Sequence, residues 1–424
     1  MSFRFIHTAD IHLGSPFKGL VKVPEKLKKR IIHSVSQAFQ EMITFAIDQE
    51  IDFIVISGDI FDQSHRSVQA QLLFKNEMER LHQAGIMCYI IHGNHDPLDG
   101  TFIELSLPPN VYVFPANTVG RQSFTIEGRE VAHIYGISYE TAKVSRNLAT
   151  LFTREDEELF SLGMLHTNCE GDRAHENYAP CSRQDLLDAG LDYWALGHVH
   201  QRKVLQQTPF IGYPGNIQGR HIREHGEKGF FVVTVEENRV LDVAFEAVQQ
   251  FVWLEQEVDV TDLETVDELM ERLEQDIEKL EELYSGSALI LRLKGTGITE
   301  LANILIERET IEGIVQHIQQ GQEYGGENES NTWLESFSFH GTSSYLREDA
   351  RQTSAVFQDI MNLVDHWESN QSNLEEEWSS INKELLKHQR AKVFLEPFSP
   401  DEQKEVLRQA ESYLLHEWLG DSRR

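Results

Sequence analysis

Asp10-Ile-His12, at the end of the apolar run of residues 3–6, is the first of five segments that decide the fold. The other four follow the β-like runs 53–56, 86–91, 162–165 and 193–196; they are Gly58-Asp59, Gly93-Asn-His-Asp96, His166 and Gly197-His-Val-His200. An apolar run that ends at a Gly or a polar residue predicts a buried strand followed by a loop at one sheet edge. Because such loops converge on one crevice in α/β sheets, the sequence predicts a single site.

The donor atoms of these segments predict a metal centre. The candidate ligands among them are two carboxylates (Asp10 and Asp59), one Asn and four or five imidazoles, a set that suits Mn, Fe or Zn, whereas Mg prefers oxygen alone. Two such ions, roughly 3.5–4 Å apart, clamp the attacking and leaving oxygens of a phosphoryl group and make hydroxide available near neutral pH. A bridging ligand must hold both ions, and Asp59 is the candidate. Taken alone, each segment also fits a capped turn or a solvated His; their joint order favours the metal site.

The same segments resemble the calcineurin-like metallophosphoesterase superfamily, and within it the SbcD-type DNA double-strand-break repair nucleases. The resemblance rests on Phe5-Ile-His-Thr-Ala-Asp-Ile-His-Leu-Gly14, Ser57-Gly-Asp-Ile-Phe-Asp62, Ile91-His-Gly-Asn-His-Asp96 and Leu196-Gly-His-Val-His200. Tyr213-Pro-Gly-Asn216 and Glu227-Lys-Gly-Phe230 resemble the family's next segment, and the YhaO-like branch is the best match. The resemblance covers about the first 235 residues and implies a two-sheet sandwich flanked by helices.

Carried over by position, the resemblance implies two ligand sets that share one residue. One metal would be held by Asp10, His12, Asp59 and His200, and the other by Asp59, Asn94, His166 and His198. Manganese is the metal we expect in the active form.

The resemblance also implies two catalytic residues. His95 would face the scissile phosphate, and Asp62 would orient its ring where archaeal and eukaryotic members carry a His. His92 and Asn216 also depart from the family pattern, and the role of Asn216 is open.

Length and composition predict a cytoplasmic enzyme with two or three domains. The chain has 424 residues, too many for one hydrophobic core. We find no apolar run near 18 residues and no signal-like amino terminus, so we expect no membrane span. Cys88, Cys169 and Cys181 form no C-x-x-C pair, which favours idle thiols in a reducing compartment.

The charge balance argues against strong DNA binding by this chain alone. The net charge is −31, of which residues 251–424 carry −22. Non-specific DNA affinity comes largely from neutralised phosphates. Lys18, Lys22 and the basic residues 26–30 form one local basic stretch, which fits either a DNA contact or a solvated helix face.

Hydrophobic periodicity predicts a core of βα units followed by further strands. Residues 20–49 and 67–84 are expected to be helices, and residues 131–137, 210–213, 230–235 and 240–245 are expected to be strands of a second sheet. We therefore predict a metallophosphoesterase core over residues 1–250.

From residue 251 onward we expect a small α+β capping domain to residue 340 and a helical region over 341–424. Residues 263–283 and 299–306 are expected to be helical, 287–293 and 311–319 to be strands, and the glycines at 321, 325 and 326 to mark a loop. The carboxy-terminal helices carry an apolar stripe that includes Val356, Phe357, Ile360, Leu363, Val364 and Trp367; a later stripe includes Leu407, Tyr413, Leu414, Leu415 and Trp418, after Pro397 and Pro400. By resemblance this tail docks on an SMC-like (SbcC-type) ATPase; internal packing is the alternative.

The function predicted from the sequence is a metal-dependent phosphodiesterase, in particular a DNA exonuclease of DNA repair that is a homodimer. The alternative is a phosphoesterase for small nucleotides, which shares the site chemistry but has less need of a cap and a helical tail. A non-catalytic scaffold is disfavoured by the complete ligand set and His95.

Overall fold

The computed structural model describes most of the chain. It covers residues 2–15, 23, 25–62, 67–99, 106–171, 178–284, 287–305, 307–324, 332–341, 351, 355–370, 374, 377–378, 402–404, 406–407, 410–411 and 414. The chain divides into two compact units, Met1–Trp253 and Leu254–Arg424. Lys18, Lys22, Pro397, Pro400, Tyr413, Leu415 and Trp418 lie outside the described residues.

The first sheet of the amino-terminal unit delivers the first three predicted segments. Its order is β12-β11-β1-β2-β3-β4. Parallel pairing joins β1 (Ser2–Thr8), β2 (Phe53–Ser57), β3 (Met87–Ile91) and β4 (Val111–Val113). The antiparallel strands β11 (Gly229–Glu236) and β12 (Arg239–Ala247) complete the sheet beside β1. The assignment of residues 230–235 and 240–245 to the second sheet is therefore wrong, because the apolar pattern indicates a strand but not its distant partner.

The second sheet delivers the remaining segments. Its order is β5-β6-β7-β8-β10-β9. A parallel centre is formed by β6 (Arg129–Gly136), β7 (Phe160–His166), β8 (Tyr193–Gly197) and β10 (Phe210–Tyr213). The edges β5 (Gly120–Ile126) and β9 (Lys203–Gln207) are antiparallel to their neighbours.

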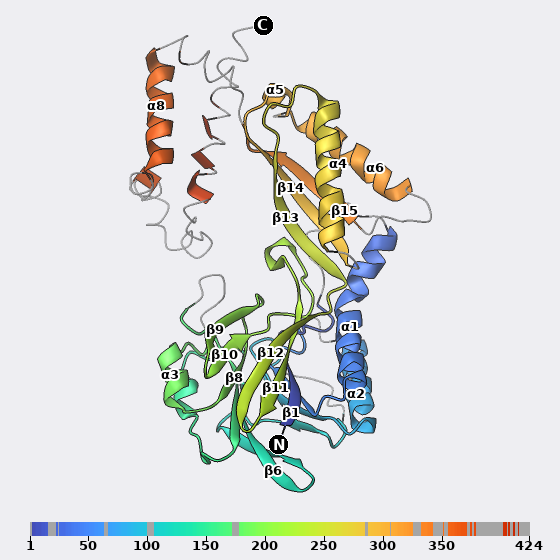
Figure 1. Cartoon of the computed structure of the whole chain (residues 1–424), viewed down its shortest axis with the longest axis vertical. Helices are drawn as coiled ribbons and strands as arrows, with labels where there is room; N and C mark the ends of the chain where they lie inside the picture. Colours follow the sequence, from blue (N-terminus) through green and yellow to red (C-terminus); the bar gives the residue numbers. More distant parts are fainter. Residues whose placement is uncertain are drawn as a thin grey trace. The chain divides into compact units, whose positions relative to one another are not determined.

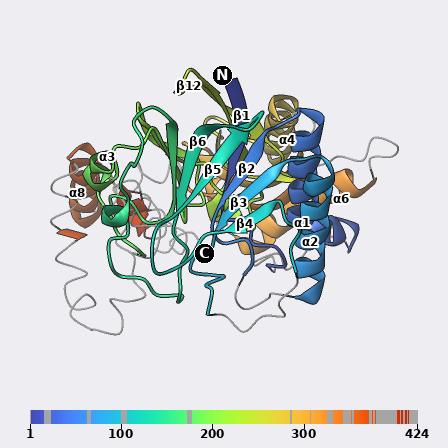
Figure 2. The same cartoon turned by 90° about the horizontal axis from the view of Figure 1, so that it is seen from below.

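The two sheets pack face to face. Alternate residues of each strand point to opposite faces, so one set of side chains lies between the sheets and the other lies on the outer face. On β2, Phe53 and Val55 join the layer between the sheets, whereas Ile54 and Ile56 face the helices α1 (Glu25–Asp48) and α2 (Val68–Gln83). Helix α3 (Arg183–Asp188) and the short helix η1 (Ala149–Leu151) cover the outer face of the second sheet. Figures 1 and 2 show α1 and α2 side by side on the first sheet. The predicted sandwich flanked by helices is confirmed.

Helix α2 begins where the sequence predicts. Ser67 caps it with its hydroxyl oxygen, which accepts a hydrogen bond from the Ala70 N–H. The helix ends before Ala84, as expected from residues 67–84. Helix α1 likewise falls within the predicted range 20–49.

The carboxy-terminal unit contains a three-stranded sheet and helices. The strands are β13 (Phe251–Asp259), β14 (Ala288–Thr296) and β15 (Thr332–Phe339), in that order. The helices are α4 (Val266–Leu283), α5 (Ala302–Leu305) and α6 (Arg308–Tyr324). Thr265 and Glu268 form a capping box at the start of α4, which fixes the predicted acidic helix at its amino end.

The strand predicted for residues 311–319 is wrong, because these residues belong to helix α6. The β-branched residues suggested a strand, but Ile314 and Ile318 are four residues apart and both buried on one helical face. Gly321, expected in a loop, also lies in α6. The unit instead takes its third strand from β15, which pairs in parallel with β14.

Within the helical region predicted for residues 341–424, the stripe that begins at Val356 lies on helix α8 (Ala355–Ser369). Phe357, Met361 and Val364 are buried, whereas Val356 is 62% exposed and Leu363 is 45% exposed. The stripe is therefore divided between two faces of the helix.

None of the helices in the described parts of the chain is long and apolar enough to span a membrane.

His7 should make the stability of the amino-terminal unit depend on pH. Its Nε2 lies 3.1 Å from the Leu196 carbonyl and its Nδ1 lies 3.0 Å from the Tyr193 hydroxyl, an arrangement that fits the neutral ring. Burial lowers the pKa of His7 from 6.5 to about 3. Between these values the unfolded chain binds a proton that the folded chain does not, so the free energy of unfolding falls with falling pH, by up to about 1.4 kcal/mol per pH unit.

The variant His7→Gln should lose this component of the pH dependence. Urea unfolding of the two proteins between pH 7.5 and 5.5 measures it, and the exposed His82→Gln variant is the control. Parallel stability curves for the wild-type protein and His7→Gln would contradict the assignment.

Candidate metal centre

The predicted ligands converge from the carboxyl ends of parallel strands, but these strands belong to two sheets and not to the edge of one sheet as predicted. Asp10 and His12 follow β1, Asp59 follows β2, and Asn94 follows β3; His166 ends β7, and His198 and His200 follow β8. Six of the seven are at most 9% exposed, and the side chain of His200 is 18% exposed. The structure therefore brings all seven residues together in the interior.

Four of these residues have left-handed backbone conformations. The φ angles are 53° at Asp10, 52° at His12, 53° at Asp59 and 102° at His198. Positive φ is unfavourable for residues with a Cβ and persists where surrounding structure enforces it, often at functional sites. The sharp turns after β1, β2 and β8 thus direct these side chains inward, at the expense of local backbone strain.

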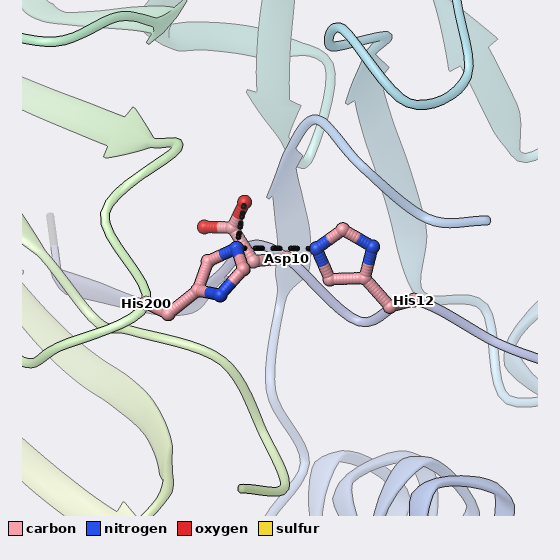
Figure 3. Close-up of side chains that lie close together, drawn as sticks. All are labelled: Asp10, His12 and His200. Carbon is pink, nitrogen blue, oxygen red and sulfur yellow. Dashed lines mark hydrogen bonds and ion pairs between the residues drawn. The ribbon is translucent and has the colours of Figure 1, made fainter. Parts of the chain in front are cut away.

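Asp10, His12 and His200 form a first group of donors. Figure 3 shows the three side chains pointing toward one another. The Nε2 atoms of His12 and His200 are 3.2 Å apart, and His200 Nε2 lies 3.9 Å from Asp10 Oδ1. Two ring nitrogens and a carboxylate oxygen at this spacing can donate to one cation.

Asn94, His166 and His198 form a second group of donors. Asn94 Oδ1 lies 3.0 Å from His166 Nε2 and 3.2 Å from His198 Nδ1. His166 Nδ1 lies 2.9 Å from the Ser57 carbonyl and must donate to it, so the lone pair of a neutral ring is at Nε2. In the neutral ring this lone pair faces the lone pairs of Asn94 Oδ1. The two would repel each other unless a proton or a metal cation lies between the two atoms.

Asp59 lies between the two groups. Its Oδ2 is 3.8 Å from His12 Nε2 and 3.4 Å from His166 Nε2. Among the described residues this buried oxygen accepts no hydrogen bond, whereas Oδ1 accepts one from the His95 N–H at 2.9 Å. A buried anionic oxygen shared by two donor groups is the arrangement a bridging metal ligand requires.

The pKa values of His166 and Asp59 are shifted by each other's charge. Burial lowers the pKa of His166, but the nearby Asp59 carboxylate outweighs burial and raises this pKa to about 9. In return, although burial opposes it, His166 holds the pKa of Asp59 well below its usual range. The buried Asp59 carboxylate therefore favours positive charge beside His166, which a proton on the ring or a metal ion would supply.

His95 and Asp62 lie beside the first group. One donor atom from each of His12, Asp62 and His95 lies within 4.8 Å of the others, and the rings of His12 and His95 are 4.9 Å apart. Asp62 Oδ2 accepts a hydrogen bond from the Ser15 hydroxyl at 3.1 Å. This placement is compatible with the predicted catalytic pair, whose roles remain predictions.

Asp96 joins the loops that carry Asp59 and Asn94. Its Oδ2 accepts a hydrogen bond from the Ile60 N–H and its Oδ1 accepts one from the Gly93 N–H, both at 2.8 Å. His92, one of the departures from the family pattern, places Nδ1 3.3 Å from the Asp96 carboxylate. The sequence pattern included Asp96 without assigning this role.

Three glycines leave room for His166. A Cβ added at Gly58, Gly93 or Gly197 would come within 3.0 Å of an atom of its ring. The ring is therefore enclosed by backbone, which fixes its position in the second group.

Sequence reasoning missed Glu224. This residue is 5% exposed, and its Oε1 lies 2.7 Å from His200 Nδ1. It is the last residue of the short helix η2 (Ile222–Glu224), in a polar segment with no periodic pattern. Its position between Asn216 and Glu227, which are both in family-like segments, is the only signal that could have pointed to it.

Two of the three thiols lie side by side. Cys169 and Cys181 are directly paired in an isolated parallel bridge, and the Cys181 sulfur is 3.3 Å from the Thr167 hydroxyl. Cys88 lies elsewhere, in the core under α1 and α2. All three are buried free thiols.

The chain is similar to known phosphoesterases in sequence. A family model described as calcineurin-like phosphoesterase matches residues 3–202, and one described as the middle domain of metallophosphoesterase YhaO matches residues 253–342. The protein described as "Uncharacterized metallophosphoesterase YhaO" from Bacillus subtilis (strain 168) is 40% identical over 293 residues, which are 69% of this chain and 72% of that protein.

More distant similarities were also found. A protein described as DNA double-strand break repair protein Mre11, from Sulfurisphaera tokodaii, is 29% identical over 218 residues, 48% of this chain and 50% of that protein. A crystal structure of a dimetal phosphatase from Danio rerio is 10% identical, with a TM-score of 0.33, and covers 55% of this chain and 93% of its own.

Asp59→Asn should reduce metal binding because a neutral amide cannot offset the charge of two cations. We expect the manganese content after loading and desalting to fall from about two ions per chain to about one or fewer. Elemental analysis measures this, with the exposed Asp242→Asn variant as control. Two retained ions in Asp59→Asn, or fewer than about one ion in the wild-type protein, would contradict a shared ligand.

Proposed function

This chain belongs to the calcineurin-like phosphoesterase family, and we propose that it is a metal-dependent phosphodiesterase that acts on DNA as an exonuclease. The family membership predicted from the sequence is thereby confirmed, and it implies a hydrolase. The observation that carries the proposal is the buried Asp59 Oδ2, which lies between two groups of donor side chains. Two cations that share an anionic ligand suit phosphodiester hydrolysis.

The proposed cofactors are two divalent ions, with manganese as the expected metal. Asp10, His12, Asp59 and His200 would hold one ion, and Asp59, Asn94, His166 and His198 the other. When bound, the ions would supply positive charge for the phosphate and lower the pKa of water. His95 would then protonate the leaving oxygen, and Asp62 would orient the His95 ring.

The case for DNA rests on the relative described as a DNA double-strand break repair protein. The net charge of −31 opposes it, because phosphate neutralisation supplies much of DNA affinity. Lys28, Lys29 and Arg30 are exposed on α1, but Arg30 also stacks over Phe251 at 5.4 Å. A basic partner subunit would resolve the conflict.

A second candidate function is hydrolysis of small nucleotides or other small phosphodiesters. The charge of −22 on residues 251–424 favours it, since a small substrate needs no long basic surface. The site chemistry is the same for both candidates, so only substrate preference distinguishes them.

The deciding experiment compares substrates on the manganese-loaded full-length protein. Linear single- and double-stranded DNA, bis-p-nitrophenyl phosphate and cyclic nucleotides would be tested at matched enzyme concentration. A DNA exonuclease should release nucleotides from DNA ends. Preference for small nucleotides over DNA would favour the second candidate, and inactivity on every phosphodiester would contradict both.

The proposed partner is an SMC-like ATPase that docks on α8. Because Phe357 and Val364 are buried, they are not the docking residues expected from the sequence. Val356, Ile360, Leu363 and Trp367 recur at helical spacing on the more exposed face of α8.

The double variant Val356→Asp, Leu363→Asp should abolish co-purification of the ATPase and spare hydrolysis of a small phosphodiester. The control is Leu241→Asp, at an exposed position on β12.

The proposed homodimer would form through α1 and α2. Ile32 on α1 and Val68 and Leu72 on α2 are 56%, 47% and 45% exposed, which supports this surface. Light scattering that gave the 48.8 kDa of one chain at micromolar concentration would contradict it.

His95→Ala should retain metal while turnover falls on the order of 10²-fold or more, the usual scale for a lost general acid. Asp62→Asn should cause a smaller loss, because the ring stays but is less well oriented. Steady-state kinetics on bis-p-nitrophenyl phosphate, with metal content measured in parallel, tests both variants against the exposed His82→Ala control. Near-normal turnover of His95→Ala would remove it from the mechanism.

A further inference from the structure

His200 is oriented from outside the metal centre by one carboxylate. Its Nε2 faces Asp10 and His12, and its Nδ1 lies 2.7 Å from Glu224 Oε1. Arg220 Nη2, which can only donate, also lies 3.4 Å from Nδ1, but the Glu224 contact is much shorter. Because an ionised carboxylate only accepts hydrogen bonds, Nδ1 carries a proton and donates it to Glu224. The neutral ring therefore has its lone pair at Nε2, on the side of the first donor group. This is the tautomer that a metal ligand requires.

Glu224 itself is fixed by several donors. Its Oε1 lies 3.0 Å from Arg220 Nη2, and its Oε2 accepts from the Arg220 backbone N–H at 2.8 Å and from Asn216 Nδ2 at 3.0 Å. His221 Nε2 lies 3.6 Å from Oε1. A buried carboxylate with this many donors has one favourable position, since each movement would break a charge-assisted hydrogen bond. The open role of Asn216 is thereby accounted for.

The same network reaches the other side of the first donor group. Arg220 Nη1 donates to the Ser15 hydroxyl at 3.0 Å, and that hydroxyl donates to Asp62 Oδ2 at 3.1 Å. The chain of contacts thus runs from His200 through Glu224 and Arg220 to Asp62. It connects a proposed ligand to the residue proposed to orient His95.

We propose that Glu224 is a positioning residue, which holds the His200 ring in the tautomer and orientation that a cation in the first donor group needs. Arg220 and Asn216 act through Glu224 by fixing its carboxylate. This inference rests on the proposed function, because it assumes that His200 binds metal. A purely structural role is the competing explanation, since Glu224 would also stabilise the loop as the counter-ion of Arg220.

The test is metal binding by Glu224→Gln, a change that keeps the shape of the side chain and removes its charge. Manganese titration by calorimetry and by electron paramagnetic resonance should show one site weakened by about 10- to 100-fold, the usual effect of losing such a partner. The other site should keep its wild-type affinity. Glu227→Gln, an exposed glutamate of the same loop, is the matched control and should bind as the wild type does.

The possible outcomes separate this inference from the proposed function. A wild-type protein that binds no manganese would contradict the proposed function itself. Two wild-type-like sites in Glu224→Gln would overturn the positioning role, and so would an equal loss of both sites. Urea unfolding without metal reports the structural contribution of Glu224 separately.

A second variant serves if Glu224→Gln does not fold. Asn216→Ala keeps the Glu224 charge and removes one of its hydrogen bonds. It should weaken the same single manganese site by a smaller factor. Unchanged binding in Asn216→Ala, together with an unfolded Glu224→Gln, would assign Glu224 to structure alone.

Discussion

The amino-terminal unit depends on two carboxylates that are buried without a direct ion pair to Lys or Arg among the described residues. Asp10 and Asp59 are each 1% exposed, and their close partners in the described chain are imidazoles and backbone N–H groups, not Lys or Arg. An uncompensated buried carboxylate is costly. The fold tolerates two of them because imidazoles close by can hold either protons or metal ions. The carboxylates and imidazoles that must be compensated for the unit to fold are therefore the same groups that would bind the metal ions.

The carboxylates of the site divide their work between structure and chemistry. Asp10 accepts the His198 N–H and Asp59 Oδ1 accepts the His95 N–H, so each joins its own loop to the loop of another strand. Asp96 makes the same kind of connection through Oδ2, which accepts the Ile60 N–H, while its Oδ1 accepts the Gly93 N–H of its own loop. Asp59 Oδ2 is left over and faces the two donor groups. In Asp59, Oδ1 thus holds the loop in place, and Oδ2 is the oxygen that faces the proposed metal positions.

The sequence predicted the strands that carry the ligands, because buried parallel strands are continuous apolar runs with abrupt ends. It did not predict α6 or β15, since the β-branched residues of 311–319 obscured a helical spacing and the sheet order depends on distant pairing. Glu224 was missed for a related reason: its environment comes from Arg220, Asn216 and His200, and no local pattern encodes such a network. The exposed and buried faces of α8 could be separated only once its packing was known.

The glycines around His166 determine which sequence changes the centre can absorb. At Gly58, Gly93 and Gly197 the smallest possible side chain would already strike the imidazole. At Gly93 it would also strike Asp59 Oδ1, and at Gly197 the Ser57 carbonyl oxygen, so moving the ring alone would not make room for alanine there. The mutational tolerance of the centre is thus limited by positions that contribute no donor atom. In family-wide sequence variation or in a mutational scan, these glycines would be as restricted as the ligands that they surround.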